Sequence, residues 1–122
     1  MPRTSVVFYQ DADGACPFLE WFSELPVKAQ DKCFVRLERL RDLGHELRRP
    51  EADILRDGIH ELRISFRGIH YRILYFFHGT VVTVITHGLV KERAVPAAEI
   101  DRAMARKKRF EANPSRHSYR ET

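Results

Sequence analysis

Alternating apolar and polar residues dominate the middle of the chain and predict three consecutive β-strands. Residues 59–66, 69–77 and 80–90 place apolar side chains mostly at every second position, which is the period of a strand with one buried face. Neighbouring segments are separated by Arg67-Gly68 and by His78-Gly79, and two-residue links of this kind are typical of β-hairpins. The pattern therefore predicts an antiparallel meander.

The two short turns also predict which residues lie opposite one another. If Phe66 and Ile69 close the first turn, Arg63 lies opposite Arg72 and Ser65 lies opposite His70. If Phe77 and Thr80 close the second turn, His70 lies opposite His87. The face expected to pack on the core carries Leu62, Ile64, Phe66, Ile69, Tyr71, Ile73, Tyr75, Phe77, Val82, Val84 and Val90. The opposite, more polar face carries Glu61, Arg63, Ser65, His70, Arg72, Leu74, Phe76, Ile85, His87, Leu89 and Lys91.

Helical spacing appears on both sides of this meander. Apolar residues recur every three or four positions in 18–25 and again in 33–43, and Pro26 and Gly44 mark the ends of these helices. Pro96 opens a last helix with a basic outer side, whose cations are Arg102, Arg106, Lys107, Lys108 and Arg109. Short strands are expected at 5–9 and 54–56. The order predicts an α+β domain with helices stacked on one face of the sheet, over residues 1–112, followed by a polar, frayed tail over 113–122.

Composition and charge narrow the class of protein. The 122 residues suffice for one domain, and 43% hydrophobic and 31% charged residues are ordinary for a globular protein. Residues 1–58 carry 9 Lys and Arg against 11 Asp and Glu, whereas residues 59–122 carry 12 against 6, so the second half could attract a polyanion. Cys16 and Cys33 are expected to be buried free thiols. With no apolar stretch long enough to span a membrane and no signal pattern, we expect a cytoplasmic protein without a membrane partner.

The opposed arginines are the most specific chemical feature. Like charges directly opposite each other destabilise a sheet unless an anion lies between them, and a phosphate would serve. RNA cleavage by its own 2′-hydroxyl needs a base, an acid and cations that stabilise the phosphorane, for which histidines and arginines are suited. The polar face brings together Arg63, Arg72, His70, His87 and Lys91. No metal-ligand spacing, P-loop or dinucleotide motif occurs, so no metal or cofactor is expected.

Several motifs together resemble a known family. The elements are Glu61-Leu-Arg63, Tyr71–Phe77, His87-Gly-Leu-Val-Lys91 and Pro96-x-x-Glu-Ile-x-x-Ala103, and they are similar to the phage-derived branch of RelE/HigB-type toxins of toxin–antitoxin pairs. The resemblance implies a RelE-like α+β fold, with an N-terminal strand and helical hairpin packed on a sheet of four or five mainly antiparallel strands and a C-terminal helix. It also implies metal-independent cleavage of messenger RNA on the ribosome, and neutralisation by a cognate antitoxin, often a helix-turn-helix protein.

The resemblance, together with the basic residues of the sheet face and of the last helix, gives candidate site residues. The catalytic candidates are Arg63, Arg72, His87 and Lys91, and the arginines are expected to clamp the phosphate. The RNA-binding candidates are Arg67, His70, Arg93, Arg106, Lys107 and Lys108. The family often has a second lysine after Lys91, where this chain has Glu92, and Arg93 could substitute for it. Which residue acts as base or acid is left open.

Two other functions are compatible with the same sequence. One is a non-catalytic inhibitor of DNA gyrase, as in the ParE branch of the same fold, and the other is an inactive, domesticated prophage RNA-binding protein. The imidazole-rich sheet face favours the nuclease, because a gyrase inhibitor needs no proton-transfer groups.

Overall fold

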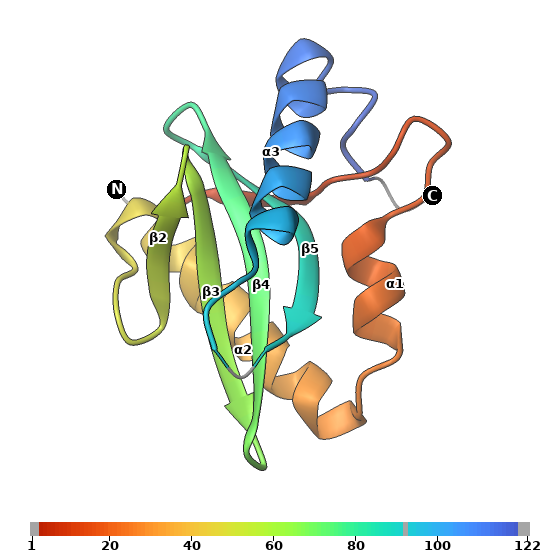
Figure 1. Cartoon of the computed structure of the whole chain (residues 1–122). Helices are drawn as coiled ribbons and strands as arrows, with labels where there is room; N and C mark the ends of the chain where they lie inside the picture. The colour runs from red at the N-terminus through yellow and green to blue at the C-terminus, as the bar shows by residue number, and fades with distance from the viewer. Residues whose placement is uncertain (1–2, 92, 120–122) are drawn as a thin grey trace.

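The computed structural model describes residues 3–91 and 93–119, so the Glu92 position lies outside the described residues. The elements follow one another as β1 (Ser5–Phe8), α1 (Pro17–Ser23), α2 (Val27–Leu43), the short 3₁₀ helix η1 (Gly44–Glu46), β2 (Ala52–Arg56), β3 (Ile59–Phe66), β4 (Ile69–His78), β5 (Val82–Val90) and α3 (Ala97–Ala112). The five strands form one sheet in the order β1-β5-β4-β3-β2, in which β1 is parallel to β5 and the other pairs are antiparallel (Figure 1). This confirms the predicted α+β layout. No helix of the described residues is long and apolar enough to cross a membrane.

Local signals set the helix boundaries as predicted. Proline lies at the first position of α1 and immediately before both α2 and α3, where its fixed φ and missing N–H suit the start of a helix. Gly44 ends α2 with a φ of 51°, in the left-handed region that favours glycine. Cys16 precedes α1 and Cys33 lies within α2, and both are buried free thiols. Burial raises the pKa of Cys33 to about 11, so this thiol is unreactive.

Helices cover both faces of the sheet, and the prediction that they stack on one face is wrong. Helices α1 and α2 cover one face over a core that includes Leu62, Ile73 and Tyr75. Helix α3 crosses the other face, where Leu74, Phe76 and Val84 form a second apolar cluster with Ile100, Ala103 and Phe110 (Figure 1). The apolar residues on the more polar face therefore have a partner, and only the part of that face beyond α3 remains open for a site.

The β4–β5 pairing differs from the predicted one. His78 pairs with Val82, so three residues connect the strands instead of two, and Thr86 is an extra residue because Tyr75 pairs with Ile85 and Leu74 with His87. His87 is therefore opposite Leu74, and the predicted pairs of His70 with His87 and of Phe77 with Thr80 are wrong. Before Thr86 the pairing is displaced from the predicted one by an odd number of residues, which exchanges the two faces of the strand. Val82 and Val84 therefore lie on the α3 side and Ile85 on the α1–α2 side, opposite to the prediction. Beyond Thr86 the alternation returns to the predicted faces.

The tail after α3 is ordered over its described part, so the prediction of a frayed segment is wrong for residues 113–119. Ser118 forms an isolated bridge with Tyr9, and the N–H of Tyr119 donates to the carbonyl of Phe8 at 2.8 Å. The His117 ring stacks on the Tyr9 ring with centroids 5.3 Å apart. The tail thus continues the sheet beside β1.

Candidate functional site

The β3–β4 hairpin places the two arginines as the sequence predicts. Arg67 and Gly68 both have positive φ, 51° and 79°, as a two-residue hairpin turn of this kind requires. Phe66 pairs with Ile69 and Arg63 with Arg72, which confirms the predicted register. The two guanidinium groups therefore extend from adjacent strands on the α3 side of the sheet.

A carboxylate of the protein lies between the two arginines. Glu61 is 4% exposed, and its Oε2 accepts a hydrogen bond from Arg63 Nε at 2.7 Å. Its other oxygen lies 3.5 Å from Arg72 Nε, and Asp53 on β2 lies 3.3 Å from Arg63 Nη2. An anion is expected between the opposed arginines, and Glu61 supplies this negative charge in place of the suggested phosphate. The carboxylates also fix both guanidinium groups in place.

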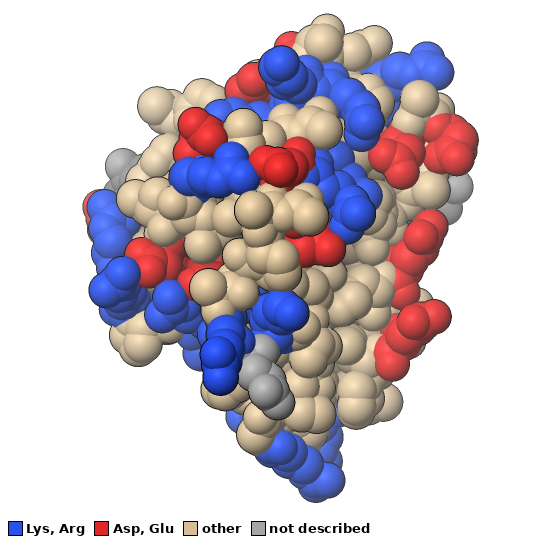
Figure 2. Space-filling view, in the orientation of Figure 1, with Lys and Arg blue, Asp and Glu red and all other residues tan. Residues whose placement is uncertain are grey.

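These residues line an open groove of about 560 Å³. It runs from the edge strand β2 over β3 and β4 to the loop between β5 and α3. Its lining is Asp53, Ile54, Leu55, Arg56, Glu61, Arg63, Arg72, Arg93, Ala94, Val95 and Ile100. Figure 2 shows basic side chains gathered on this part of the surface.

The lining of the groove carries more arginines than carboxylates. Four arginines line it against two carboxylates. Arg56 is held at the rim by Asp57 and by Asp101 of α3, at 3.1 and 2.6 Å. Arg72 donates through Nη1 to the Tyr71 carbonyl at 3.1 Å, and only 14% of its side chain is exposed. An anion in this groove would meet guanidinium donors whose orientation is already fixed.

His87 lies away from the groove, beneath α3. The residue is 6% exposed, its Nε2 is 2.9 Å from Glu99 Oε1, and its Nδ1 is 2.9 Å from Thr86 Oγ1. Burial, followed by the nearby Arg106 charge, lowers its pKa to about 4 in spite of Glu99. The ring is therefore neutral and enclosed at pH 7, and it ties β5 to the first turn of α3.

His70 and Lys91 lie side by side on the same face as the arginines. The N–H of Lys91 donates to the carbonyl of His70 at 2.9 Å, and both side chains are partly exposed. The His70 Nδ1 is 2.9 Å from Ser65 Oγ, as the predicted Ser65–His70 pair allows. Because Arg72 is two residues from His70 on the same strand, about 7 Å separates the two positions. The structure therefore brings His70 and Lys91, rather than His87, to the open part of the sheet face that carries Arg63 and Arg72.

The remaining basic candidates are spread over the molecule. Arg67 is exposed at the hairpin turn, with its guanidinium carbon 5.2 Å from the Phe66 ring centroid. Lys107 Nζ reaches the carbonyl of Asp57 at 3.4 Å, and Lys108 is exposed on the outer side of α3. Arg106 lies in a separate groove on the other side of α3 from the arginine pair.

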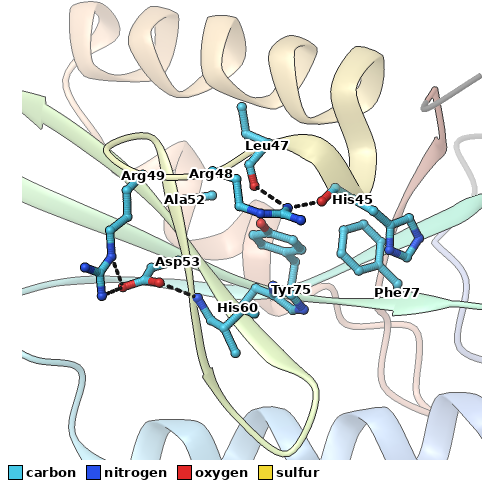
Figure 3. Close-up of a pocket in the computed structure, with 10 residues that line it drawn as sticks. His45, Leu47, Arg48, Arg49, Ala52, Asp53, His60, Tyr75 and Phe77 are labelled. Atoms are coloured by element: carbon cyan, nitrogen blue, oxygen red, sulfur yellow. Dashed lines mark hydrogen bonds and ion pairs between the residues drawn. The ribbon is translucent and has the colours of Figure 1, made fainter.

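A smaller cavity of about 280 Å³ opens on the α2 side of the same sheet edge (Figure 3). The His60 ring stacks on Tyr75 and the His45 ring stacks on Phe77, with centroids 5.2 and 3.7 Å apart. Arg48 closes one side, where its guanidinium donates to the carbonyls of His45 and Leu47. Burial lowers the pKa of His60. This cavity shares Asp53 and Ile54 with the arginine groove, so the two meet at β2.

Within residues 3–91 and 93–119, no group of three or more His, Cys, Asp or Glu side chains is arranged to hold a metal ion. The strand pattern predicts the correct face for Glu61 but indicates no role for it. Its spacing of two from Arg63 along a strand was the available signal, because such neighbours share a face. Asp53 could not be found in this way, since it is brought to the site by the β2–β3 pairing.

Comparison with known proteins adds an independent observation. A search of curated proteins found no match to this chain. The sequence model of a family described as "Phage derived protein Gp49-like (DUF891)" matches residues 20–108. The match covers most of the chain, including α2, the four strands β2–β5 and the groove residues. The chain therefore belongs to the Gp49-like family of phage-derived proteins.

Proposed function

We propose that this chain is the toxin of a toxin–antitoxin pair and cleaves messenger RNA on the ribosome by metal-independent chemistry. The groove over β3 and β4 carries this proposal, because it holds Arg63 and Arg72 against one buried carboxylate with further arginines at its rim. Membership of a phage-derived family that includes RelE-like toxins supports the toxin role.

The arrangement suits the charge that develops in phosphodiester cleavage. Attack of a 2′-hydroxyl on the adjacent phosphorus gives a phosphorane with extra negative charge, and guanidinium donors stabilise it best when they are already oriented. Glu61 orients both arginines and leaves part of each guanidinium group facing the groove. In this proposal Arg63 and Arg72 hold the scissile phosphate, and Arg93 and Arg67 contact the neighbouring backbone.

Proton transfer is assigned to the exposed end of the sheet face. His70 is accessible and held by Ser65, and Lys91 lies on the adjacent strand. An imidazole can both accept and donate a proton, so His70 is the better choice for base or acid, and Lys91 stabilises charge beside it. His87 acts as a positioning residue, because it fixes Glu99 and hence the start of α3.

The partners follow from the same surface. The groove and the outer side of α3 offer cations to ribosomal and messenger RNA, whose phosphates attract such surfaces. An antitoxin with acidic side chains, such as a helix-turn-helix protein with an acidic extension, would neutralise the toxin by covering the groove. The site lies at the protein surface, so this covering needs no change of fold.

The test is cleavage of a defined messenger RNA on purified ribosomes. Wild-type protein should produce fragments that end in a 2′,3′-cyclic phosphate, the product of attack by the RNA's own 2′-hydroxyl. Arg93→Gln should lower cleavage by roughly tenfold or more without loss of stability, since it removes an exposed cation at the groove rim. Arg41→Gln, an equal charge change on α2 far from the groove, is the matched control.

The histidines provide a second comparison. His70→Gln should lower cleavage by about 10²–10⁴ and remove one limb of the pH–rate profile, whereas ribosome binding stays unchanged. His87→Gln should keep the pH–rate profile of the wild type. Equal activity of wild type and His70→Gln would remove His70 from the mechanism.

The charge pairing of the central arginines also fits a non-catalytic function, and the same experiment tests it. Glu61 and Asp53 already neutralise the two central arginines, which a surface that only binds protein would also tolerate. A gyrase inhibitor of the ParE type would block supercoiling and leave messenger RNA intact on ribosomes. That pair of results would refute the nuclease proposal and establish the alternative.

A further inference from the structure

A second groove lies on the opposite side of α3 from the arginine pair. It encloses about 590 Å³ between α3, the segment that follows β1 and the tail after α3. None of its lining residues belongs to the first groove. They are Tyr9, Asp11, Ala12, Asp13, Arg102, Ala105, Arg106, Arg109 and His117.

Three arginines of α3 face this groove together. Arg102, Arg106 and Arg109 are four and three residues apart, the spacing that aligns side chains on one face of a helix. Arg102 is paired with Glu99 at 2.9 Å. Across the groove lie Asp11 and Asp13, and together with Glu99 they bring three carboxylates near the three arginines.

Two buried polar atoms in this groove have no partner in the described part of the chain. Tyr9 is 0% exposed and its hydroxyl lies beside Asp11 and Arg109, yet it makes no hydrogen bond of normal geometry within residues 3–91 and 93–119. Nη1 of Arg106 is buried and unpaired in the same region. Buried polar groups are nearly always hydrogen-bonded, so two orphans in one groove point to a missing partner.

The positions of both groups are fixed by packing. The Tyr9 ring stacks on the His117 ring, with centroids 5.3 Å apart. The guanidinium carbon of Arg106 lies over the Tyr9 ring, 5.9 Å from its centroid. His117 is held in turn by a 2.8 Å hydrogen bond between its Nδ1 and the Gln10 carbonyl. Burial raises the pKa of Tyr9, so its hydroxyl stays protonated and can donate.

We propose that this groove binds a phosphate group, with the Tyr9 hydroxyl and Arg106 Nη1 as its donors and Arg109 beside them. A guanidinium group has donors only, and a tetrahedral oxyanion presents acceptors in several directions, so the two satisfy each other. The site is separate from the proposed cleavage groove and does not depend on that function. The Asp11 carboxylate competes with phosphate for the same cations and therefore weakens phosphate binding.

The experiment measures binding of inorganic phosphate by calorimetry and by thermal unfolding, at constant ionic strength set with chloride. Wild-type protein should bind phosphate saturably and gain thermal stability. Arg106→Gln should weaken binding by about tenfold or more, since it removes a charged donor. Lys108→Gln removes the same charge from the exposed side of the same helix and should bind like wild type.

Tyr9→Phe provides the sharper variant, because it deletes one oxygen atom and keeps the packed ring. Phosphate binding should fall by severalfold, whereas stability without phosphate should be equal or higher, since an unsatisfied hydroxyl is removed. Asp11→Asn should tighten binding. A short single-stranded oligoribonucleotide that displaces phosphate would identify an RNA backbone as the source of the group, and failure to displace it would identify free phosphate.

The proposal would be overturned by either of two results. One is a wild-type response to phosphate no larger than the response to chloride at equal ionic strength. The other is identical phosphate affinity in Tyr9→Phe, Arg106→Gln and Lys108→Gln. Both results are independent of messenger RNA cleavage, so they do not bear on the proposed toxin activity.

Discussion

Replacing Arg63 by Gln tests whether Glu61 is the counter-ion of the arginine pair. From the sequence alone, removal of either arginine should leave stability unchanged or slightly higher, because two like charges lie opposite each other. The structure reverses this expectation. Glu61 is 4% exposed and takes its 2.7 Å hydrogen bond from Arg63, so the variant leaves a buried carboxylate with a weaker partner.

The expected magnitude follows from the contacts. A hydrogen bond to a charged group contributes about 1.5–3 kcal/mol, and relief of like-charge repulsion returns about 0.2–1 kcal/mol. The side chain of Arg63 is 33% exposed, so solvent screening places the result toward the lower end. We expect Arg63→Gln to cost about 1–2 kcal/mol, or roughly 4–8 °C in melting temperature for a chain of this length. Arg72→Gln should cost less, because its Nε is 3.5 Å from the same carboxylate.

Urea unfolding of a double-mutant cycle with Glu61→Gln isolates the interaction. The two changes together should cost less than their sum, with a coupling energy of about 1–2 kcal/mol. Arg49→Gln is the control, because Arg49 contacts Asp53 at 2.8 Å but its side chain is 75% exposed, and it should change stability by less than about 0.5 kcal/mol. A coupling energy near zero, together with unchanged stability of Arg63→Gln, would refute the counter-ion role of Glu61.

Three further predictions concern the body of the fold. Burial holds the pKa of His87 near 4 rather than 6.5, so between these pH values the unfolded chain binds a proton that the folded chain does not. The free energy of unfolding, measured with urea at several pH values, should therefore fall by about 3 kcal/mol as the pH drops from about 6.5 to about 4. His87→Gln should lack this loss, and equal pH profiles of the two proteins would refute the prediction. Gly88→Ala should destabilise the protein by about 1–3 kcal/mol in thermal unfolding, because the added Cβ would lie only 2.2 Å from Trp21 Cε3, and wild-type stability would contradict that close packing. Charge reversal at Lys107 and Lys108 should weaken ribosome association and flatten its salt dependence, with stability within about 0.5 kcal/mol of wild type; an unchanged salt slope would show that this side of α3 does not contact RNA.

Local signals account for the parts that the sequence predicted correctly. The β3–β4 register is set by a two-residue turn, because Arg67-Gly68 can adopt positive φ at both positions and leaves only one way to pair the strands. Pro26 and Pro96 likewise mark the starts of α2 and α3, and Gly44 marks the end of α2. The Arg63–Arg72 pair follows from these local features alone.

Other features depend on contacts between distant segments. The β4–β5 register depends on the three-residue connection before β5 and on the extra residue Thr86, and the alternation pattern reveals neither. A displacement of the register by an odd number of residues exchanges the two faces of a strand. The same sheet residues could face solvent or a helix, and only the packing of α3 buries His87 and removes it from the open face.

The sequence by itself therefore determined the set of elements, the α+β class and the opposed arginines, because these depend on residues close together in the chain. The tertiary structure decided what surrounds those arginines. Glu61 and Asp53 meet Arg63 through strand pairing, and Tyr9 meets Arg106 through packing of the first strand, the last helix and the tail. Charge and burial at a site depend on all the segments that converge there, and this convergence is a property of the folded chain.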